Sequence, residues 1–241
     1  MDLPRIIGHR GAAATAPENT LASFRTAAAM GVTMVEFDVM LTRDDRAVVF
    51  HDETLERTTD GHGRLREAPL ATLIGLDAGG WFEPNFAGEP VPTLEAVLGL
   101  LQGLGIGANI EIKPTHPSDT RTAEIAIAVA AGLWPVDRPP PLLSSFSRRC
   151  LQVAEELAPT WPRGLIVDRL PSDWHEAAQA LGLSTIHCLH RHLSPVVVAE
   201  IKRTGLGVVA WTVNELERAE TLWGWGVEAV ISDVPDVLQE G

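Results

Sequence analysis

The sequence predicts an α/β fold, and within that class a (β/α)8 or TIM barrel with a small insertion after the second strand. Short apolar segments alternate with segments of helical character almost throughout, and eight of the apolar segments are typical of strands. The chain has 241 residues, close to the roughly 250 that are usual for such a barrel. A doubly wound open sheet is the alternative, but no Gly-rich phosphate loop supports it.

The individual elements follow from apolar runs and from helix-start signals. The predicted strands lie near residues 5–8, 33–39, 108–112, 142–145, 164–167, 185–188, 207–211 and 228–231. Side chains that accept hydrogen bonds from a first helical turn precede several helical segments, and the predicted N-caps are Asn19, Thr93, Ser147, Ser194 and Asn214. Pro195 supports a helix start at its position, and Glu217 completes a capping box with Asn214.

The alternation breaks once, between residues 47 and 92. An apolar run ends there in His51-Asp52, and Gly and Pro turns follow. We expect residues 1–241 to form a single domain, with an inserted subdomain at about 54–91 that covers the C-terminal mouth of the barrel. We also expect the apolar residues of the insertion to pack inward; they include Leu70, Leu73, Trp81, Phe82 and Phe86.

The composition excludes several function classes. The formal net charge is 19 − 32 = −13, which argues against nucleic-acid binding. The same charge repels anions, so a phosphate-bearing substrate must be held by local cations. The two cysteines, Cys150 and Cys188, form no disulfide framework. With no secretory signal and no apolar run of about 18 residues, we expect a cytoplasmic protein without a membrane partner.

Ionisable residues gather at the ends of three predicted strands. Glu36 and Asp38 alternate with apolar neighbours, so a strand directs both into the barrel, and Glu111 and Lys113 repeat the spacing. Three carboxylates crowded in a barrel repel one another and are costly to bury. Lys113 and Arg10 could offset these negative charges without a metal ion. A divalent cation that prefers oxygen ligands, Mg²⁺ or Ca²⁺, is the other solution, and the spacing leaves both open.

Two histidines complete the predicted site. His9 and His51 come from different segments, as general acid–base catalysis across a bond requires. Arg10 is suited to a bidentate grip on phosphate. His187 with its neighbours matches no standard zinc spacing, so we expect it in the core or at the rim. Trp211 ends a predicted strand, where it either walls a pocket or fills the barrel top.

The chain resembles the glycerophosphodiester phosphodiesterase family over nearly its whole length. The residues that carry the resemblance are His9-Arg10-Gly11, Pro17-Glu18-Asn19-Thr20, Glu36-Phe37-Asp38-Val39, Val49-Phe50-His51-Asp52, Arg57-Thr58-Thr59-Asp60-Gly61-His62-Gly63, Glu111-Ile112-Lys113, Trp211-Thr212-Val213-Asn214 and Ser232-Asp233. Phe50, where an aliphatic residue is expected, is a mild departure.

The resemblance implies a metal-dependent enzyme that releases sn-glycerol 3-phosphate from glycerophosphodiesters. It assigns the metal ligands to Glu36, Asp38 and Glu111, acid–base catalysis to His9 and His51, phosphate contacts to Arg10 and Lys113, and the glycerol side to Trp211. Two alternatives remain at this stage. One is a phospholipase D-like relative that releases a cyclic phosphate from lysolipids, and the other is a non-catalytic module that binds a phosphorylated small molecule.

Overall fold

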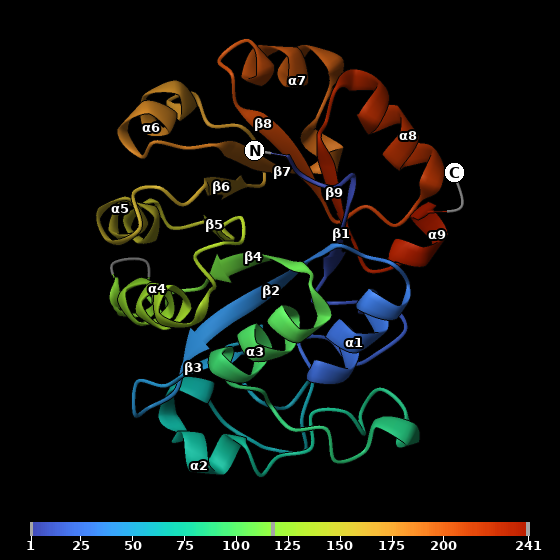
Figure 1. Cartoon of the computed structure of the whole chain (residues 1–241), viewed down its shortest axis with the longest axis vertical. Helices are drawn as coiled ribbons and strands as arrows, with labels where there is room; N and C mark the ends of the chain where they lie inside the picture. The colour runs from blue at the N-terminus through green and yellow to red at the C-terminus, as the bar shows by residue number, and fades with distance from the viewer. Residues whose placement is uncertain (1, 117–118, 240–241) are drawn as a thin grey trace.

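A computed structural model, which describes residues 2–116 and 119–239, confirms the (β/α)8 barrel (Figure 1). Eight parallel strands form the barrel, and it closes because β1 pairs with both β2 and β9. The barrel strands are β1 Ile6–His9, β2 Met34–Leu41, β4 Gly107–Ile112, β5 Leu142–Ser145, β6 Arg163–Val167, β7 Thr185–Leu189, β8 Gly207–Trp211 and β9 Ala229–Ser232.

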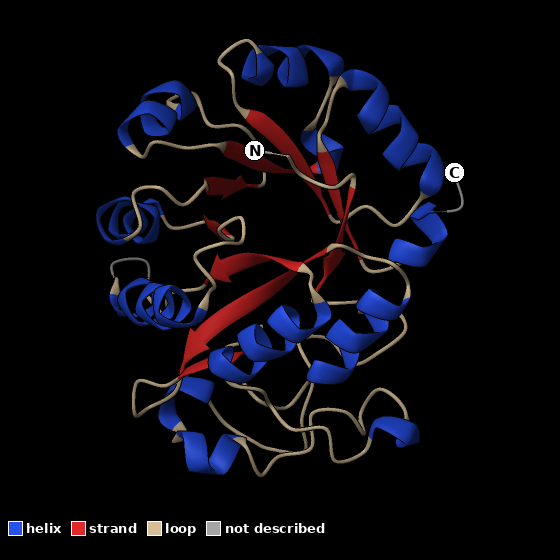
Figure 2. Ribbon diagram, in the orientation of Figure 1, coloured by secondary structure: helices blue, strands red, loops and turns tan. Residues whose placement is uncertain are grey.

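Helices connect the strands and surround them, as the blue ring outside the red strands in Figure 2 shows. The α-helices of this ring are α1 Leu21–Ala29, α3 Leu94–Leu104, α4 Arg121–Leu133, α5 Arg148–Leu157, α6 Trp174–Ala180, α7 Pro195–Lys202, α8 Leu216–Trp225 and α9 Pro235–Gln239. A short 3-10 helix, η3 His190–His192, precedes α7. The strands therefore bury their outer faces against helices, which leaves their inner faces to fill the barrel.

The inside of the barrel is apolar at one end and polar at the other. Ile7, Met34, Leu142, Val209 and Ala229 form a buried cluster contributed by five strands. Because successive strand residues alternate in direction, the residues two positions further along these strands also point inward. In β1, β2 and β5 those positions are His9, Glu36 and Ser144, so these polar groups stand on a packed apolar base.

Each predicted strand lies within two residues of the observed one, and most predicted helix starts are also correct. The side chains of Thr93, Ser147 and Ser194 accept hydrogen bonds from the backbone N–H three residues on, as N-caps do. Each bond satisfies one of the amide groups that a first helical turn leaves unpaired.

Two predicted caps are wrong. Thr20, not Asn19, caps α1 by accepting from the Ser23 N–H. Asn19 is buried and donates instead to Asp38 Oδ2 at 2.9 Å. Glu215 stands at the N-cap position of α8 without a capping bond, while Asn214 donates to Asp233 Oδ2 at 2.7 Å. In both cases an amide that the local pattern assigns to a helix serves a carboxylate elsewhere in the chain.

The segment between β2 and α3 departs from the barrel pattern. The strand β3 Ala47–Val49 pairs antiparallel with β2, and the segment continues through η1 Leu65–Glu67, α2 Leu70–Leu73 and η2 Pro84–Phe86. Leu55, Leu65, Leu73 and Ala78 pack with Met40, Val48, Phe50 and Val91 in a cluster of their own. Figure 1 shows this segment below β3 and α3, at one side of the barrel.

The expectation that the apolar residues of this segment pack inward holds only in part. Leu73 is fully buried in the small cluster and Leu70 packs against it. Trp81, Phe82 and Phe86 instead stack edge to face on one another outside that cluster, and Trp81 is 40% exposed. Phe82 thus contacts both of the other rings, and the three form an aromatic group separate from the small cluster.

Among the described residues, no helix has both the length and the apolar character needed to cross a membrane. The thiols of Cys150 and Cys188 are buried and unpaired.

Candidate active site

The predicted site residues converge at the C-terminal ends of the barrel strands. His9 ends β1, Glu36 and Asp38 lie in β2, Glu111 lies in β4, and Trp211 ends β8. A cavity of about 180 Å³ opens among them. Seven of the eight predicted residues line it, namely His9, Arg10, Glu36, His51, Glu111, Lys113 and Trp211. The eighth, Asp38, has a carboxylate oxygen within 4.8 Å of those of Glu36 and Glu111.

A tight turn after β1 positions Arg10. Arg10 and Gly11 both have left-handed backbone angles, with φ of 50° and 95°. The turn packs directly on α1, because a Cβ on Gly11 would lie 2.3 Å from Ser23 Oγ. Ser23 Oγ donates to the Arg10 carbonyl and accepts from the Ala12 N–H, each at 2.9 Å. A non-glycine residue in this conformation is strained, and here the strain directs the Arg10 N–H to Glu36 Oε2 at 3.2 Å.

One of the three central carboxylates is well compensated. Asp38 lies 3.3 Å from both Lys113 Nζ and Arg10 Nε, and it accepts from Asn19 Nδ2. Burial acts to raise the pKa of Asp38, but Lys113 and Arg10 together outweigh it and hold that pKa below its ordinary value. Asp38 therefore carries its charge inside the barrel.

The other two carboxylates have no such partners. Glu36 is 3% exposed, and burial and the neighbouring charge of Asp38 raise its pKa well above the ordinary value. The same two causes raise the pKa of Glu111 to about 8. Within residues 2–116 and 119–239, Glu111 makes no hydrogen bond or ion pair. Arg10 acts to lower the pKa of Glu36, and Lys113 and Arg10 act to lower that of Glu111, but burial and the charge of Asp38 outweigh them. A cation with oxygen ligands fits the set of three carboxylates.

Each histidine is held by a carboxylate. His9 Nδ1 lies 2.6 Å from Asp233 Oδ1, just beyond the end of β9, and its Nε2 lies 3.9 Å from Glu36 Oε2. His51 Nδ1 lies 2.5 Å from Asp52 Oδ1. In both rings the second nitrogen, Nε2, is left to face the cavity. This is how a general acid or base is oriented toward a substrate.

A chain of ion pairs connects the second histidine to the first turn. Asp52 accepts two hydrogen bonds from Arg57, and Arg57 donates two more to Glu18. Glu18 in turn accepts from Arg10 at 2.6 Å. Burial is the main cause that lowers the pKa of His51 below its ordinary value, against an opposing contribution from Asp38.

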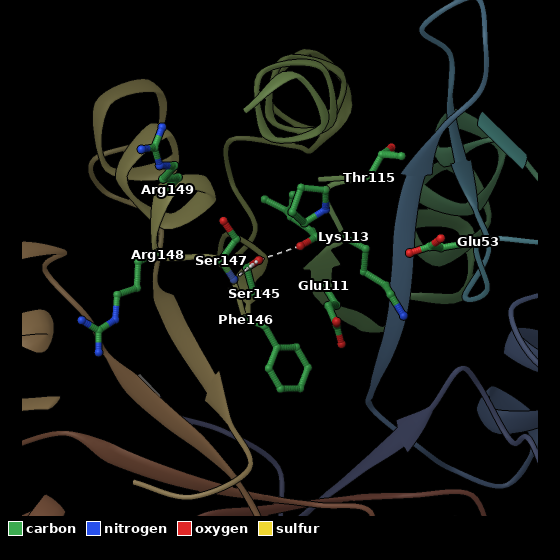
Figure 3. Close-up of a pocket in the computed structure, with 11 residues that line it drawn as sticks. Glu53, Glu111, Lys113, Thr115, Ser145, Phe146, Ser147, Arg148 and Arg149 are labelled. Carbon is green, nitrogen blue, oxygen red and sulfur yellow. Dashed lines mark hydrogen bonds between the residues drawn. The ribbon is translucent and has the colours of Figure 1, made fainter. Parts of the chain in front are cut away.

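A wider cavity of about 560 Å³ adjoins the first and shares Glu111, Lys113 and Phe146 with it. Figure 3 shows Glu53 and Lys113 on one side of this space and Phe146 at its base. The side chains of Arg148 and Arg149 extend away from its centre, and Arg148 is paired with Asp173. The mouth of the barrel therefore combines a narrow acid-lined cavity with a broad open one.

Several residues of the site had no predicted role. Asp233, Asp52, Glu18 and Arg57 were identified only as parts of family motifs, and Phe146 was not identified at all. Position offers a signal for Asp233, because it directly follows the last barrel strand, and the ends of barrel strands carry function. The ring of Phe146 lies 5.7 Å from that of Trp211 in an edge-to-face contact, so Trp211 walls the cavity beside a second aromatic residue.

An acidic cluster between two carboxylate-bound histidines at the C-terminal mouth of a TIM barrel defines the protein as an enzyme. Comparisons with known proteins assign it to a particular family. Residues 9–237 match the model of the glycerophosphoryl diester phosphodiesterase family. The chain belongs to this family and is a phosphoric diester hydrolase.

Individual relatives cover nearly the whole chain. A glycerophosphodiester phosphodiesterase of Caldanaerobacter subterraneus is 35% identical over 97% of this chain and 95% of its own. A phosphodiesterase of Oleispira antarctica, solved with the product sn-glycerol-3-phosphate, is 39% identical, with a TM-score of 0.96 over 99% of this chain and 96% of its own. A glycerophosphodiester phosphodiesterase structure from Agrobacterium tumefaciens is 30% identical, with a TM-score of 0.84 over 99% and 100% of the two chains.

Proposed function

We propose that the protein hydrolyses glycerophosphodiesters to sn-glycerol 3-phosphate and an alcohol. The observation that carries the proposal is the pair of histidines, each with one nitrogen bound to a carboxylate and both lining one acid-rich cavity. Family membership supports it, as does the product bound to the Oleispira relative. The binding partner is then a small-molecule substrate, and neither a nucleic acid nor a membrane is part of the proposal. Oligomeric state is outside the proposal, and a cytoplasmic location stays a prediction.

The proposal includes one divalent cation, Mg²⁺ or Ca²⁺, held by Glu36, Asp38 and Glu111. Carboxylate oxygens within 4.8 Å of one another are a donor set of the right chemistry for a hard cation. Among the described residues neither Glu36 nor Glu111 forms an ion pair with a lysine or an arginine, which supports this over an ion-pair network alone. When bound, the cation supplies positive charge that polarises the phosphoryl group.

The protein's own residues divide the remaining work. Arg10 and Lys113 hold phosphoryl oxygens and offset the charge that develops on them. His9, oriented by Asp233, removes a proton from the glycerol 2-hydroxyl or from a water as it attacks phosphorus. His51, oriented by Asp52, donates a proton to the leaving oxygen as the phosphorus–oxygen bond to the alcohol breaks. If the 2-hydroxyl is the nucleophile, this step leaves a cyclic phosphate. A water then attacks its phosphorus, the bond to the 2-oxygen breaks, and that oxygen takes up a proton to give sn-glycerol 3-phosphate. Trp211 lines the side of the cavity that receives glycerol.

The domain organisation belongs to the same proposal. Residues 1–241 act as one domain with an inserted subdomain at about 54–91. The separate apolar cluster around Leu55, Leu65 and Leu73 supports an inserted unit with a core of its own. Residues 51–57 supply His51 and its ion-pair chain, so the segment contributes to chemistry where it meets the barrel.

The test combines turnover with cation binding. Glycerophosphocholine hydrolysis is measured with excess EDTA and after adding back Mg²⁺ or Ca²⁺, beside lysophosphatidylcholine as a rival substrate. We expect EDTA to abolish turnover, the cation to restore it, and the cation to raise the melting temperature because it binds the folded state. Glu36→Gln should lose both effects, whereas Glu176→Gln, an exposed acid on α6, should keep them. Full turnover in EDTA with no thermal shift would contradict the metal. A preference for the lysolipid would contradict the substrate class.

A further inference from the structure

Two buried polar side chains that line the narrow cavity, one from β4 and one from β7, have polar atoms without hydrogen-bond partners among the described residues. Asn109 in β4 is 0% exposed, and neither its amide nitrogen nor its amide oxygen has a partner among the described residues. His187 in β7 is 0% exposed as well; its Nε2 lies 2.9 Å from Thr185 Oγ1, and its Nδ1 has no partner in the described chain. Unpaired buried polar groups are rare and call for a physical reason.

Both side chains come from the inner face of the barrel. Asn109 is two residues before Glu111 on the same face of β4 and is the register partner of Glu36. His187 stands beside Ile166 in the register of β6 and β7, and Ile166 also lines the cavity. The lining of the cavity thus includes two uncharged hydrogen-bonding groups beside the ionisable ones.

The chain makes specific room for His187. A Cβ on Gly164 would lie only 2.4 Å from His187 Nε2, so the glycine of β6 is what lets the ring lie across the barrel. Burial lowers the pKa of His187 to about 3, so the ring is neutral near pH 7. A neutral imidazole and an amide each hydrogen-bond a hydroxyl group, which both donates and accepts. Neither offers the charge that an anion needs.

The two cavities orient a diester. The wide cavity around Phe146 is open and suits an alcohol of variable size, whereas the narrow one closes on Asn109 and His187. With phosphate between Arg10 and Lys113, the glycerol half extends inward, and its terminal hydroxyl, the group farthest from phosphorus, reaches deepest. We propose that Asn109 and His187 form a subsite for this terminal hydroxyl and determine specificity for glycerol. This inference rests on the proposed function.

The experiment compares two substrates that differ in one hydroxyl. Glycerophosphocholine carries the terminal hydroxyl, and 2-hydroxypropyl phosphocholine lacks it but keeps the 2-hydroxyl that the reaction uses. We expect the wild-type enzyme to favour the first in kcat/KM by about tenfold to a hundredfold, since the second leaves buried polar groups unpaired. Asn109→Leu and His187→Leu should bring the ratio close to one, mainly by raising KM for glycerophosphocholine.

The controls separate recognition from folding. Ser144→Ala removes another buried hydroxyl that has no partner in the described chain, from outside the lining of the narrow cavity, and should leave the ratio unchanged. Asn109→Leu should melt no lower than wild type, because its amide has no hydrogen bond to lose. The subsite would be overturned by a kcat/KM ratio near one in wild type or by an unchanged ratio in both variants. Equal losses on both substrates with a lower melting temperature would also overturn it. If the cation-loaded wild type failed to hydrolyse glycerophosphocholine, the proposed function itself would fail.

Discussion

The two histidines proposed as acid and base reach the same cavity by different means. His9 ends a barrel strand, and its carboxylate, Asp233, comes from the opposite end of the chain just beyond β9. His51 follows the short antiparallel strand β3, and its carboxylate is the next residue, Asp52. Closure of the barrel between β1 and β9 therefore positions the first pair. The second pair depends on local geometry and on the ion pairs around it.

The charges behind the two carboxylates also differ. Asp233 is backed by the neutral amide of Asn214, whose nitrogen donates to it and whose oxygen accepts from the Asp233 N–H. Asp52 is backed by the guanidinium of Arg57. His9 is therefore oriented by the scaffold, whereas His51 is oriented by a chain of ion pairs. The Arg57 side chain in that chain is 45% exposed. Substitutions at the histidines and at their partners should therefore affect activity to different extents.

The histidines themselves should show the largest effect. His9→Ala and His51→Ala should each lower kcat by at least about 10²–10⁴-fold, as expected when a general acid or base is removed. His62→Ala and His175→Ala, both exposed, are the matched controls and should stay near wild type. Steady-state kinetics on glycerophosphocholine measures all four. Near-normal turnover of His51→Ala on a substrate with a poor leaving group would refute its role as acid.

Substitution of the carboxylates that orient the histidines, Asp233 and Asp52, should give the next largest effect. Asp233→Asn should lower kcat by about a hundredfold or more, because an amide beside Nδ1 favours the wrong imidazole tautomer. Asp52→Asn should lose less, since the charge of Asp52 is already shared with Arg57. Comparing kcat for the two variants at the pH optimum, with folding checked by circular dichroism, tests the order. A larger loss in Asp52→Asn would reverse the comparison.

Most of the fold could be predicted from sequence, because each barrel strand has a local apolar pattern and three of the helices begin at a local capping residue that was predicted. Thr93, Ser147 and Ser194 cap their helices because nothing distant competes for their hydroxyl groups. Asn19 and Asn214 were predicted wrongly for the opposite reason. Tertiary structure places Asp38 beside one and Asp233 beside the other. Each Asn amide nitrogen donates to that carboxylate, and each amide oxygen, the atom that would cap a helix, accepts from the N–H of the same aspartate.

The candidate site was predicted as a set of residues but not as a network. Seven of its eight residues line one cavity because alternation in a strand and the common edge of a barrel are readable from sequence. The hydrogen-bond and ion-pair partners of these residues could not be predicted from sequence. Asp233 meets His9 across 224 residues of sequence, and Arg57 selects Glu18 and Asp52 only once the inserted segment folds back. The packing of Trp81, Phe82 and Phe86 outside the small core of the insertion likewise depends on tertiary structure.

Arg57→Gln should have the smallest effect on kcat, but it distinguishes the roles of the two histidines most sharply. Arg57 is the main cause that lowers the pKa of Asp52 to about 2, and without it Asp52 is still ionised near neutral pH. His51 then faces a carboxylate whose charge is no longer shared, so its protonated form is stabilised and its pKa rises. Exposed ion pairs contribute about 0.2–1 kcal/mol, which corresponds to about half a pH unit, with a change in kcat of less than about fivefold.

The direction of the shift is what matters in the pH profile of kcat/KM. If His51 is the acid, it must be protonated, so activity persists to higher pH and the alkaline limb moves up. If His51 is the base, it must be neutral, and the acid limb moves up instead. Arg46→Gln, which removes an exposed pair with Glu95 on the outside of the barrel, is the control and should move neither limb. A shift of the acid limb alone would exchange the assigned roles, making His51 the base and His9 the acid, while leaving the ionic chain intact as the device that tunes His51.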